Sequence, residues 1–172
     1  MSSSSPASRR EVAQNSPETR EFASARGELR GERQPYFDDV SVGDEIPALT
    51  VTVDETQMFF FSAATYNGHR IHYDKEWARD REGYDTVLVQ GPLQAALLSR
   101  ALTDWIGGDG RLVAFSVQNR AIAHPGQELT FGGTVTGKRD NGVVDLDIYC
   151  KRGDDVLMPG TATVALPQRG TS

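Results

Sequence analysis

Residues 91–108 read GPLQAALLSRALTDWIGG, and this stretch decides the fold. A proline stands at its second position and two glycines stand at its end, which is the arrangement that starts and stops an α-helix. Its apolar residues cover nearly the whole circumference of that helix: Leu93, Ala95, Ala96, Leu97, Leu98, Ala101, Leu102, Trp105 and Ile106. A helix that is apolar on all sides must be buried on all sides, so the rest of the chain has to wrap it.

The chain after this helix is suited to do so. Its pattern predicts four long strands, at residues 112–122, 128–138, 143–151 and 156–166. Short turns rich in Gly, Asp, Asn and Pro separate them, which is typical of an antiparallel meander. A curved antiparallel sheet wrapped around one long central helix is a hotdog fold, and we therefore predict a single α+β hotdog domain.

The chain before the helix alternates between strand and helix signals. The elements expected there are a strand at 46–53, a short buried helix at 58–64 capped by Asp54, a second short helix at 75–81 capped by Asp74, and a brief strand at 86–89. No internal repeat is present, so one hotdog domain is expected and not a tandem pair.

Residues 1–34 differ in composition from the rest of the chain. They hold few large apolar residues and are rich in Ser, Arg, Glu and Gly without periodicity, so packing cannot offset the entropy lost on ordering them. We predict a disordered or loosely docked arm at 1–34, the hotdog domain at 35–167 and a tail at 168–172.

Composition excludes several classes of protein. No apolar run approaches the roughly 20 residues that span a bilayer, and the arm has neither the apolar core of a secretion signal nor the low acid content of a transit peptide. The single cysteine, Cys150, excludes an intramolecular disulfide, and the net charge of −6 disfavours binding to nucleic acid. These features predict a cytoplasmic protein without a nucleic-acid or membrane partner.

Two of the three histidines lie close together in residues 64–74, which read ATYNGHRIHYD. Histidine titrates near neutral pH, so His69 and His72 are suited to proton transfer in either direction. A polar loop that only satisfies its own backbone is the alternative interpretation. A metal site is disfavoured because the segment lacks a third and a fourth ligand in suitable spacing.

A second segment of interest is Gln90-Gly91-Pro92, directly before the long helix. A glycine there exposes a backbone N–H at the positive end of the helix dipole. Such a group can donate to a thioester carbonyl and stabilise the enolate oxygen that forms when the β-carbon is attacked. The alternative is that Gly-Pro serves only the geometry of the helix start.

Together these segments resemble a known family. Residues 67–74, NGHRIHYD, followed by Gln90-Gly91-Pro92-Leu93 and the apolar helix, resemble the MaoC-like (R)-specific enoyl-CoA hydratases. Within that group the chain is most similar to the mesaconyl-CoA and itaconyl-CoA hydratase branch. Residues 102–107 and 128–135 also resemble hydratase subunits of steroid side-chain degradation. The resemblance covers roughly residues 36–167.

The resemblance implies a hydratase/dehydratase that acts on the 2,3 double bond of an acyl-CoA. The family pairs an aspartate with a histidine five residues later; here His72 matches the histidine, and Asn67 stands at the aspartate position. An amide cannot accept a proton but can orient a water, so His72 is the implied acid/base, alone or with His69. Gly91, Gln90 and Arg70 are the candidate oxyanion and substrate-binding residues. Arg70, Arg120, Lys138 and Arg139 are all weak candidates for contact with the CoA phosphates.

The resemblance also implies partners, and two alternative functions remain open. Hotdog domains pair through their sheets, so a homodimer or a heterodimer with a related hotdog subunit is expected. No metal and no cofactor is expected beyond the coenzyme A of the substrate. One rival is a non-catalytic acyl-CoA-binding subunit, which Asn67 keeps open. The other is a thioesterase, which needs a carboxylate on the central helix, where the only one is Asp104 near the far end.

Overall fold

The computed structural model describes residues 34–170, so the predicted arm lies outside the described residues except for Gln34. The helical elements are η1 (Phe37–Asp39), α3 (Glu55–Thr65), η2 (Arg70–His72), α4 (Lys75–Glu82) and α5 (Gly91–Ile106). The strands are β1 (Leu49–Thr52), β2 (Arg111–Val117), β3 (Glu128–Arg139), β4 (Val143–Arg152) and β5 (Asp155–Ala165). No helix among these residues is long and apolar enough to cross a membrane.

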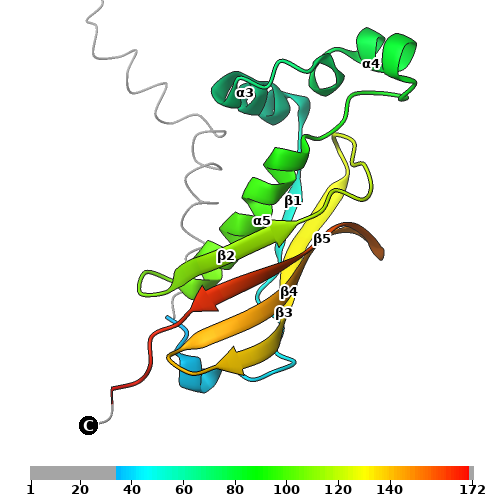
Figure 1. Cartoon of the computed structure of the whole chain (residues 1–172). Coiled ribbons are helices and arrows are strands. Elements are labelled where there is room, and N and C mark those ends of the chain that lie inside the picture. The colour runs from blue at the N-terminus through cyan, green and yellow to red at the C-terminus, as the bar shows by residue number, and fades with distance from the viewer. Residues whose placement is uncertain (1–33, 171–172) are drawn as a thin grey trace, which may run out of the picture. The chain divides into compact units, whose positions relative to one another are not determined.

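The five strands form one antiparallel sheet in the order β1-β3-β4-β5-β2 (Figure 1). The hairpins of the β3-β4-β5 meander turn at Gly142 and Gly153, whose φ angles of 78° and 56° favour glycine. β2 leaves α5 and pairs with β5 at one edge, while β1 pairs with β3 at the other. The predicted meander is therefore confirmed for its last three strands only, because the first, β2, pairs with β5 and not with its neighbour in sequence, β3.

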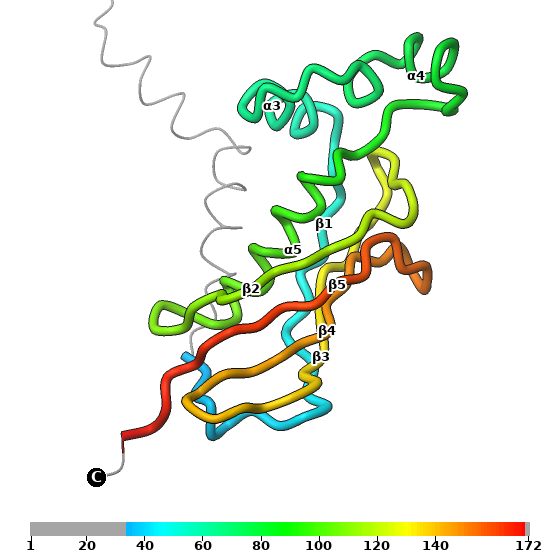
Figure 2. The backbone as a smooth tube through the Cα atoms, viewed as in Figure 1, coloured from blue at the N-terminus to red at the C-terminus, as the bar shows by residue number. Residues whose placement is uncertain are grey.

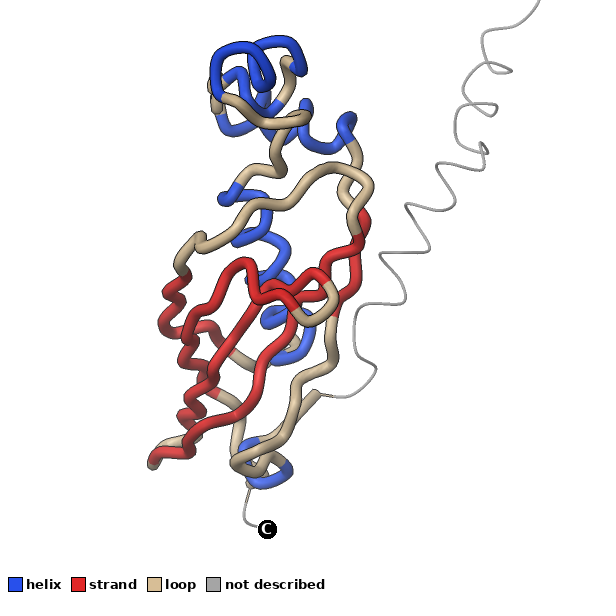
Figure 3. Tube along the Cα trace, turned by 90° about the vertical axis from the view of Figure 1, so that its right-hand side faces the viewer, coloured by secondary structure: helices blue, strands red, loops and turns tan. Residues whose placement is uncertain are grey.

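Helix α5 packs against one face of this curved sheet, in contact with β1, β2, β3 and β4 (Figures 1 and 3). Its buried residues recur every three or four positions and meet a sheet core that includes Phe131 and Leu146. Burial on all sides, however, is wrong for the single chain. Ala96 is exposed and Trp105 is only half-buried, because one sheet can cover only one side of a helix. The arrangement is nevertheless the predicted α+β hotdog fold.

Helices α3 and α4 gather beyond the end of the sheet where α5 begins (Figure 2). The caps predicted for them are present: Asp54 accepts from the Gln57 N–H at 2.6 Å, and Asp74 accepts from the Trp77 N–H at 2.9 Å. The expectation that the first helix is buried is wrong. Only Met58 and Ser62 of α3 are buried, because the helix lies past the edge of the sheet.

Three expected strands differ from the structure. The strand expected at 46–53 is confined to Leu49–Thr52, and the one expected at 112–122 ends at Val117. The segment at 86–89 is not a strand. It is hydrogen-bonded to two separate places, through the Leu88 N–H to Ile71 O and the Val89 N–H to Ala123 O, so no ladder forms.

Both ends of the described chain are tied to the domain. The Gln34 side chain donates to Ile106 O at 2.7 Å and accepts from the Asp109 N–H at 3.0 Å, so it satisfies backbone groups at the end of α5. Arg169, in the segment expected to be a tail, pairs with Asp39 at 2.7 Å. The compact unit of the described residues thus begins at Gln34 and includes Arg169.

Candidate functional site

The turn after α3 delivers Asn67. Tyr66 adopts a left-handed backbone with φ of 55°, which ends the helix, and the next N–H, that of Asn67, donates to Ser62 O at 2.9 Å. The Asn67 side-chain oxygen accepts from the His69 N–H at 3.3 Å. The chain therefore reverses within a few residues and leads directly into η2, which carries His72.

The ring of His72 is held in one tautomer. Its Nδ1 lies 2.8 Å from Leu88 O, and a carbonyl oxygen can only accept, so Nδ1 carries the proton and Nε2 is left as an acceptor. Partial burial lowers the pKa of His72 below 6.5; the bond to Leu88 opposes this shift, and the charge of nearby His69 adds to it. His72 is thus neutral near pH 7, with a basic nitrogen at Nε2.

His69 lies beside His72. The two ring centroids are 5.9 Å apart, and the ring planes are nearly perpendicular. His69 Nε2 is also 3.8 Å from a carboxylate oxygen of Glu82. The structure therefore brings the two histidines together, with Asn67 bonded to the backbone of the first.

The start of α5 has a backbone donor without a partner. No side chain caps this helix, Pro92 has no N–H, and the Gly91 N–H makes no hydrogen bond within residues 34–170. The side chain of Asn119 packs over Gly91: a Cβ at position 91 would lie 2.9 Å from Asn119 Cγ and closer still to Nδ2. A side chain at position 91 would therefore have to displace the Asn119 amide.

The Gly91 segment and the histidine turn are joined by hydrogen bonds. The Leu88 N–H donates to Ile71 O at 2.9 Å, and Leu88 O accepts from His72. Gly91 is three residues beyond Leu88, a span of at most about 10 Å. His72 and the N–H of Gly91 consequently belong to one small unit in the structure.

Gln90 and Arg70 are both engaged within the chain. Gln90 is fully buried, and its amide donates to α3, at Met58 O and Ser62 Oγ. Arg70 pairs with Asp74 and stacks 4.3 Å above the ring of Trp77. The Trp77 N–H and then Arg70 lower the pKa of Asp74, so this carboxyl is an ionised helix cap.

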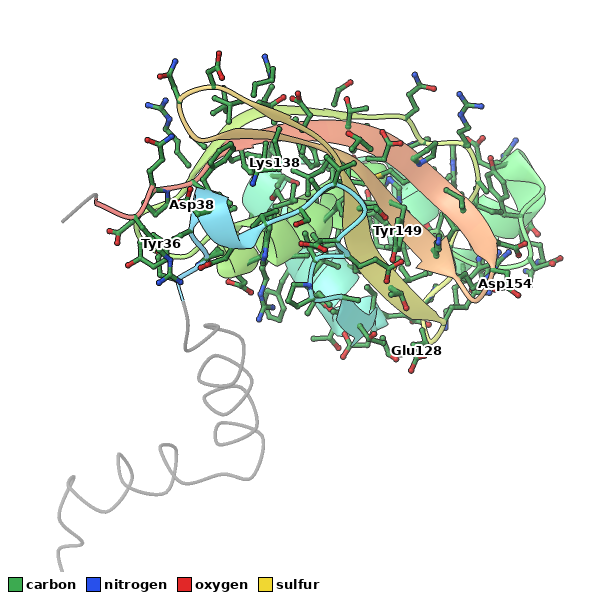
Figure 4. All side chains as sticks on the ribbon, turned by 90° about the horizontal axis from the view of Figure 1, so that it is seen from below. Tyr36, Asp38, Glu128, Lys138, Tyr149 and Asp154 are labelled. Carbon is green, nitrogen blue, oxygen red and sulfur yellow. The ribbon has the colours of Figure 1, made fainter. Side chains whose placement is uncertain are left out.

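The weaker phosphate candidates lie in different places. Lys138 donates to Phe37 O and Val40 O, and Arg139 pairs with Asp145. Lys138 stands at the η1 end of the sheet, opposite the end marked by Glu128, where β1 leads into α3 (Figure 4). Ten residues of strand separate the two ends, roughly 30 Å, so Lys138 and Arg139 are excluded from the site.

Arg120 is exposed and donates only to a neutral acceptor, Gln118 Oε1, at 2.8 Å. Its positive charge is therefore not paired with a carboxylate among the described residues. As for metals, no three His, Cys, Asp or Glu side chains within residues 34–170 are grouped so that they could hold an ion.

The contacts that support the site have little or no signal in the sequence. Ser62 carries a weak signal, since it is a polar residue within the apolar run Phe59-Phe60-Phe61-Ser62-Ala63. The roles of the Leu88 carbonyl and of Asn119 have no sequence signal, because they depend on which segments meet in space.

Three comparisons relate the chain to known proteins. The family model of hydroxyacyl-thioester dehydratase type 2 matches residues 10–124, which include both segments of the site and begin within the predicted arm. The mesaconyl-C(4)-CoA hydratase of Chloroflexus aurantiacus is 53% identical over 49 residues, which are 28% of this chain and 18% of that protein. The match thus spans less than a fifth of that relative.

Solved structures share the fold. A chain of the ChsH1-ChsH2 complex from Mycobacterium tuberculosis aligns with a TM-score of 0.68 and 21% identity, over 74% of this chain and 98% of its own. The MaoC-like dehydratase from Rhodospirillum rubrum aligns with a TM-score of 0.67 and 20% identity, over 80% and 99%. These likenesses and the family model confirm the resemblance to MaoC-like proteins.

Proposed function

Because the chain belongs to the hydroxyacyl-thioester dehydratase type 2 family, we propose that it adds water to the 2,3 double bond of an acyl-CoA and catalyses the reverse dehydration. The observation that carries this proposal is the hydrogen bond between His72 Nδ1 and Leu88 O. It leaves a neutral, basic Nε2 on the same unit as the Gly91 N–H, which has no partner within residues 34–170. A base and an oxyanion donor are the two groups that hydration of an enoyl thioester requires.

In the proposed hydration the thioester carbonyl accepts a hydrogen bond from the Gly91 N–H, which makes C3 electrophilic. Asn67 orients a water through its side-chain oxygen. His72 Nε2 takes a proton from this water as its oxygen bonds to C3, and the C2–C3 π electrons move towards the thioester oxygen as an enolate. The helix dipole and the Gly91 N–H stabilise that charge. The enolate then collapses, and the imidazolium of His72, alone or with His69, returns a proton to C2.

Arg70 is the group proposed to bind the substrate outside the reacting atoms. Arg70 is half exposed beside the histidine turn and is the proposed contact for a negative charge on the CoA or on the acyl chain, although it shares its own charge with Asp74. The reaction needs no cofactor beyond the coenzyme A of the substrate. Crotonyl-CoA and mesaconyl-CoA represent the straight-chain and dicarboxylic substrate classes.

We further propose that the chain acts as a homodimer or as a heterodimer with a related hotdog subunit. Two features support assembly. β2 is an edge strand of the sheet formed by residues 34–170 and exposes Val113, and α5 presents the exposed Ala96 on the side away from the sheet. The ChsH1-ChsH2 protein is itself a complex. The cytoplasmic location stays a prediction.

The test follows the loss of enoyl-thioester absorbance with purified protein and the two substrates. His72→Ala is expected to lower kcat about 10²- to 10⁴-fold, the usual contribution of an acid/base group, and Asn67→Ala to lower it less. His124→Ala is the matched control, because the ring of His124 contacts Val87 O in the same way but comes from the β2–β3 connection. Equal losses of kcat in His72→Ala and His124→Ala would show that His72 is not the acid/base of the reaction.

The alternatives have distinct outcomes. A non-catalytic subunit, favoured by the amide at Asn67, would give no turnover with any enoyl-CoA from a well-folded dimer but would still bind acyl-CoA. A thioesterase would release free CoA thiol. The carboxylate that it requires on α5 is Asp104, which pairs with Arg100 near the far end of the helix from Gly91, so this alternative is disfavoured.

A further inference from the structure

Gln90 makes an unusual set of contacts. Its side chain is 0% exposed, and its Nε2 donates to Met58 O at 2.7 Å and to Ser62 Oγ at 2.9 Å. A carbonyl can only accept, so the contact with Met58 determines which end of the amide is the nitrogen. The amide oxygen of Gln90 therefore faces elsewhere, and it has no hydrogen-bond partner in the part of the chain that the structure describes.

This half-satisfied amide is not explained by packing. A buried amide oxygen without a partner destabilises a fold, and an apolar side chain of the same size would fill the space without that cost. What distinguishes Gln90 from such a residue is the donor that it presents to α3. The role of Gln90 therefore lies in the contact that its Nε2 makes with α3.

The donor holds the end of α3. Met58 and Ser62 are the buried residues of this helix, whereas Phe59 and Phe60 on its other side are 57% and 64% exposed. No other hydrogen bond among the described residues joins α3 to residues 88–91. The position of α3 against the start of α5 thus depends on the Gln90 side chain.

The end of α3 in turn places Asn67. Ser62, which accepts from Gln90 through its hydroxyl, accepts from the Asn67 N–H through its backbone oxygen at 2.9 Å. Two residues before Gln90, Leu88 O holds the ring of His72. One short segment, residues 88–91, therefore holds His72, holds the turn that carries Asn67 and supplies the Gly91 N–H.

We infer that Gln90 is a positioning residue that sets Asn67, through Ser62, against His72 and Gly91. This inference rests on the proposed function, and it replaces the direct substrate contact expected for Gln90 from the sequence. Gln90 acts before substrate arrives: it keeps the water-orienting amide of Asn67 at the distance that attack on C3 requires. Small displacements of such a group lower the rate strongly, since about 1 Å can cost 10²-fold.

The test compares Gln90→Met with Gln94→Met. Methionine keeps the length of the side chain but has no donor. Gln94 is a matched control because it is also a buried glutamine of this region, 3% exposed, and its amide contacts Val89 O and Cys150 but not α3. Gln90→Met is expected to lower kcat about 10- to 100-fold with little change in KM, and Gln94→Met to leave kcat close to that of the wild type.

Two further readouts separate positioning from a general loss of stability. Hydrogen exchange at the Asn67 amide should be faster in Gln90→Met and unchanged in Gln94→Met. In an Asn67→Ala background, Gln90→Met should lower kcat little further, although the two side chains are not in contact. Ser62→Ala, which removes only one of the two bonds, should give a smaller effect of the same kind if Gln90→Met does not fold.

The outcomes distinguish this inference from the proposed function. If the wild type converts no enoyl-CoA, the proposed hydratase fails, and exchange at Asn67 alone decides whether Gln90 positions the turn. Unchanged exchange at Asn67 in Gln90→Met would overturn the inference. So would an equal loss of kcat in Gln94→Met, or independent, multiplicative effects of Gln90→Met and Asn67→Ala.

Discussion

Replacing Gly91 by alanine perturbs the start of α5 at the point where Asn119 covers it. The added carbon would lie 2.9 Å from Asn119 Cγ and 3.0 Å from its Oδ1, about 0.5–1 Å closer than ordinary contact. Asn119 is exposed, and its side chain makes no hydrogen bond within residues 34–170. The asparagine amide is therefore able to move, and it is the group that yields.

Two opposing terms set the change in stability. Gly91 has no positive φ, so alanine restricts the unfolded chain and adds about 0.4–1 kcal/mol to the free energy of unfolding. Crowding against Asn119 subtracts about 1–3 kcal/mol where the neighbour cannot yield, and less here. Gly91→Ala should therefore lower the free energy of unfolding by about 0–2 kcal/mol, whereas the same change in an Asn119→Ala background should raise it by about 0.5 kcal/mol.

Urea denaturation of the wild type, Gly91→Ala, Asn119→Ala and the double variant measures this change of sign in the effect of Gly91→Ala on the free energy of unfolding. Each 1 kcal/mol also shifts Tm by about 2–4 °C in a chain of this size. In the same series kcat/KM should fall in Gly91→Ala, because the displaced amide of Asn119 crowds the Gly91 N–H, and should recover when Asn119 is also alanine. A destabilisation of equal size in both backgrounds would refute the close approach of Asn119 to Gly91.

Three other groups of contacts have measurable consequences. The working form of His72 is neutral and its pKa is lowered, so kcat/KM for hydration should fall at low pH with a midpoint below pH 6.5. His69→Gln removes one cause of the lowering and should move that midpoint upward in a pH–rate profile. Gln34→Ala removes bonds to Ile106 O and the Asp109 N–H and should cost about 1–2 kcal/mol in urea denaturation, whereas an unchanged midpoint would show that α5 ends independently of residue 34. Burial raises the pKa of Cys150 to about 12, so a thiol reagent at pH 8 should label the protein only after denaturation, and rapid labelling of the native protein would contradict this burial.

The fold could be predicted from local patterns because its main elements are local. Pro92 and Gly107 bound α5, and the turns at Gly142 and Gly153 separate strands whose pairing follows from chain order. Prediction was wrong where burial depends on what covers an element. α3 has the composition of a buried helix, but it lies beyond the end of the sheet and exposes Phe59.

The candidate site could be predicted only in part for the same reason. The spacing of Asn67, His69 and His72 is visible in the sequence, and the structure keeps these residues on one turn. Their supporting contacts come from farther along the chain: the Leu88 carbonyl lies 16 residues beyond His72, and the Gln90 amide lies 28 residues beyond Ser62, which it contacts. A backbone carbonyl carries no residue-type signal, so the tautomer of His72 could not be predicted.

Because position 67 is an asparagine, the tautomer of His72 determines how the proton reaches C2 in the proposed reaction. An amide cannot hold a proton, so in the proposed reaction the proton taken from water must return to C2 from an imidazolium. Since Leu88 O occupies Nδ1 of His72, only Nε2 can exchange protons if His72 acts alone. One nitrogen then serves both the water at C3 and the carbon at C2, which requires both new bonds to form on the same face of the double bond. Hydration in deuterated water reports that geometry directly; addition to opposite faces would require His69 as the second donor.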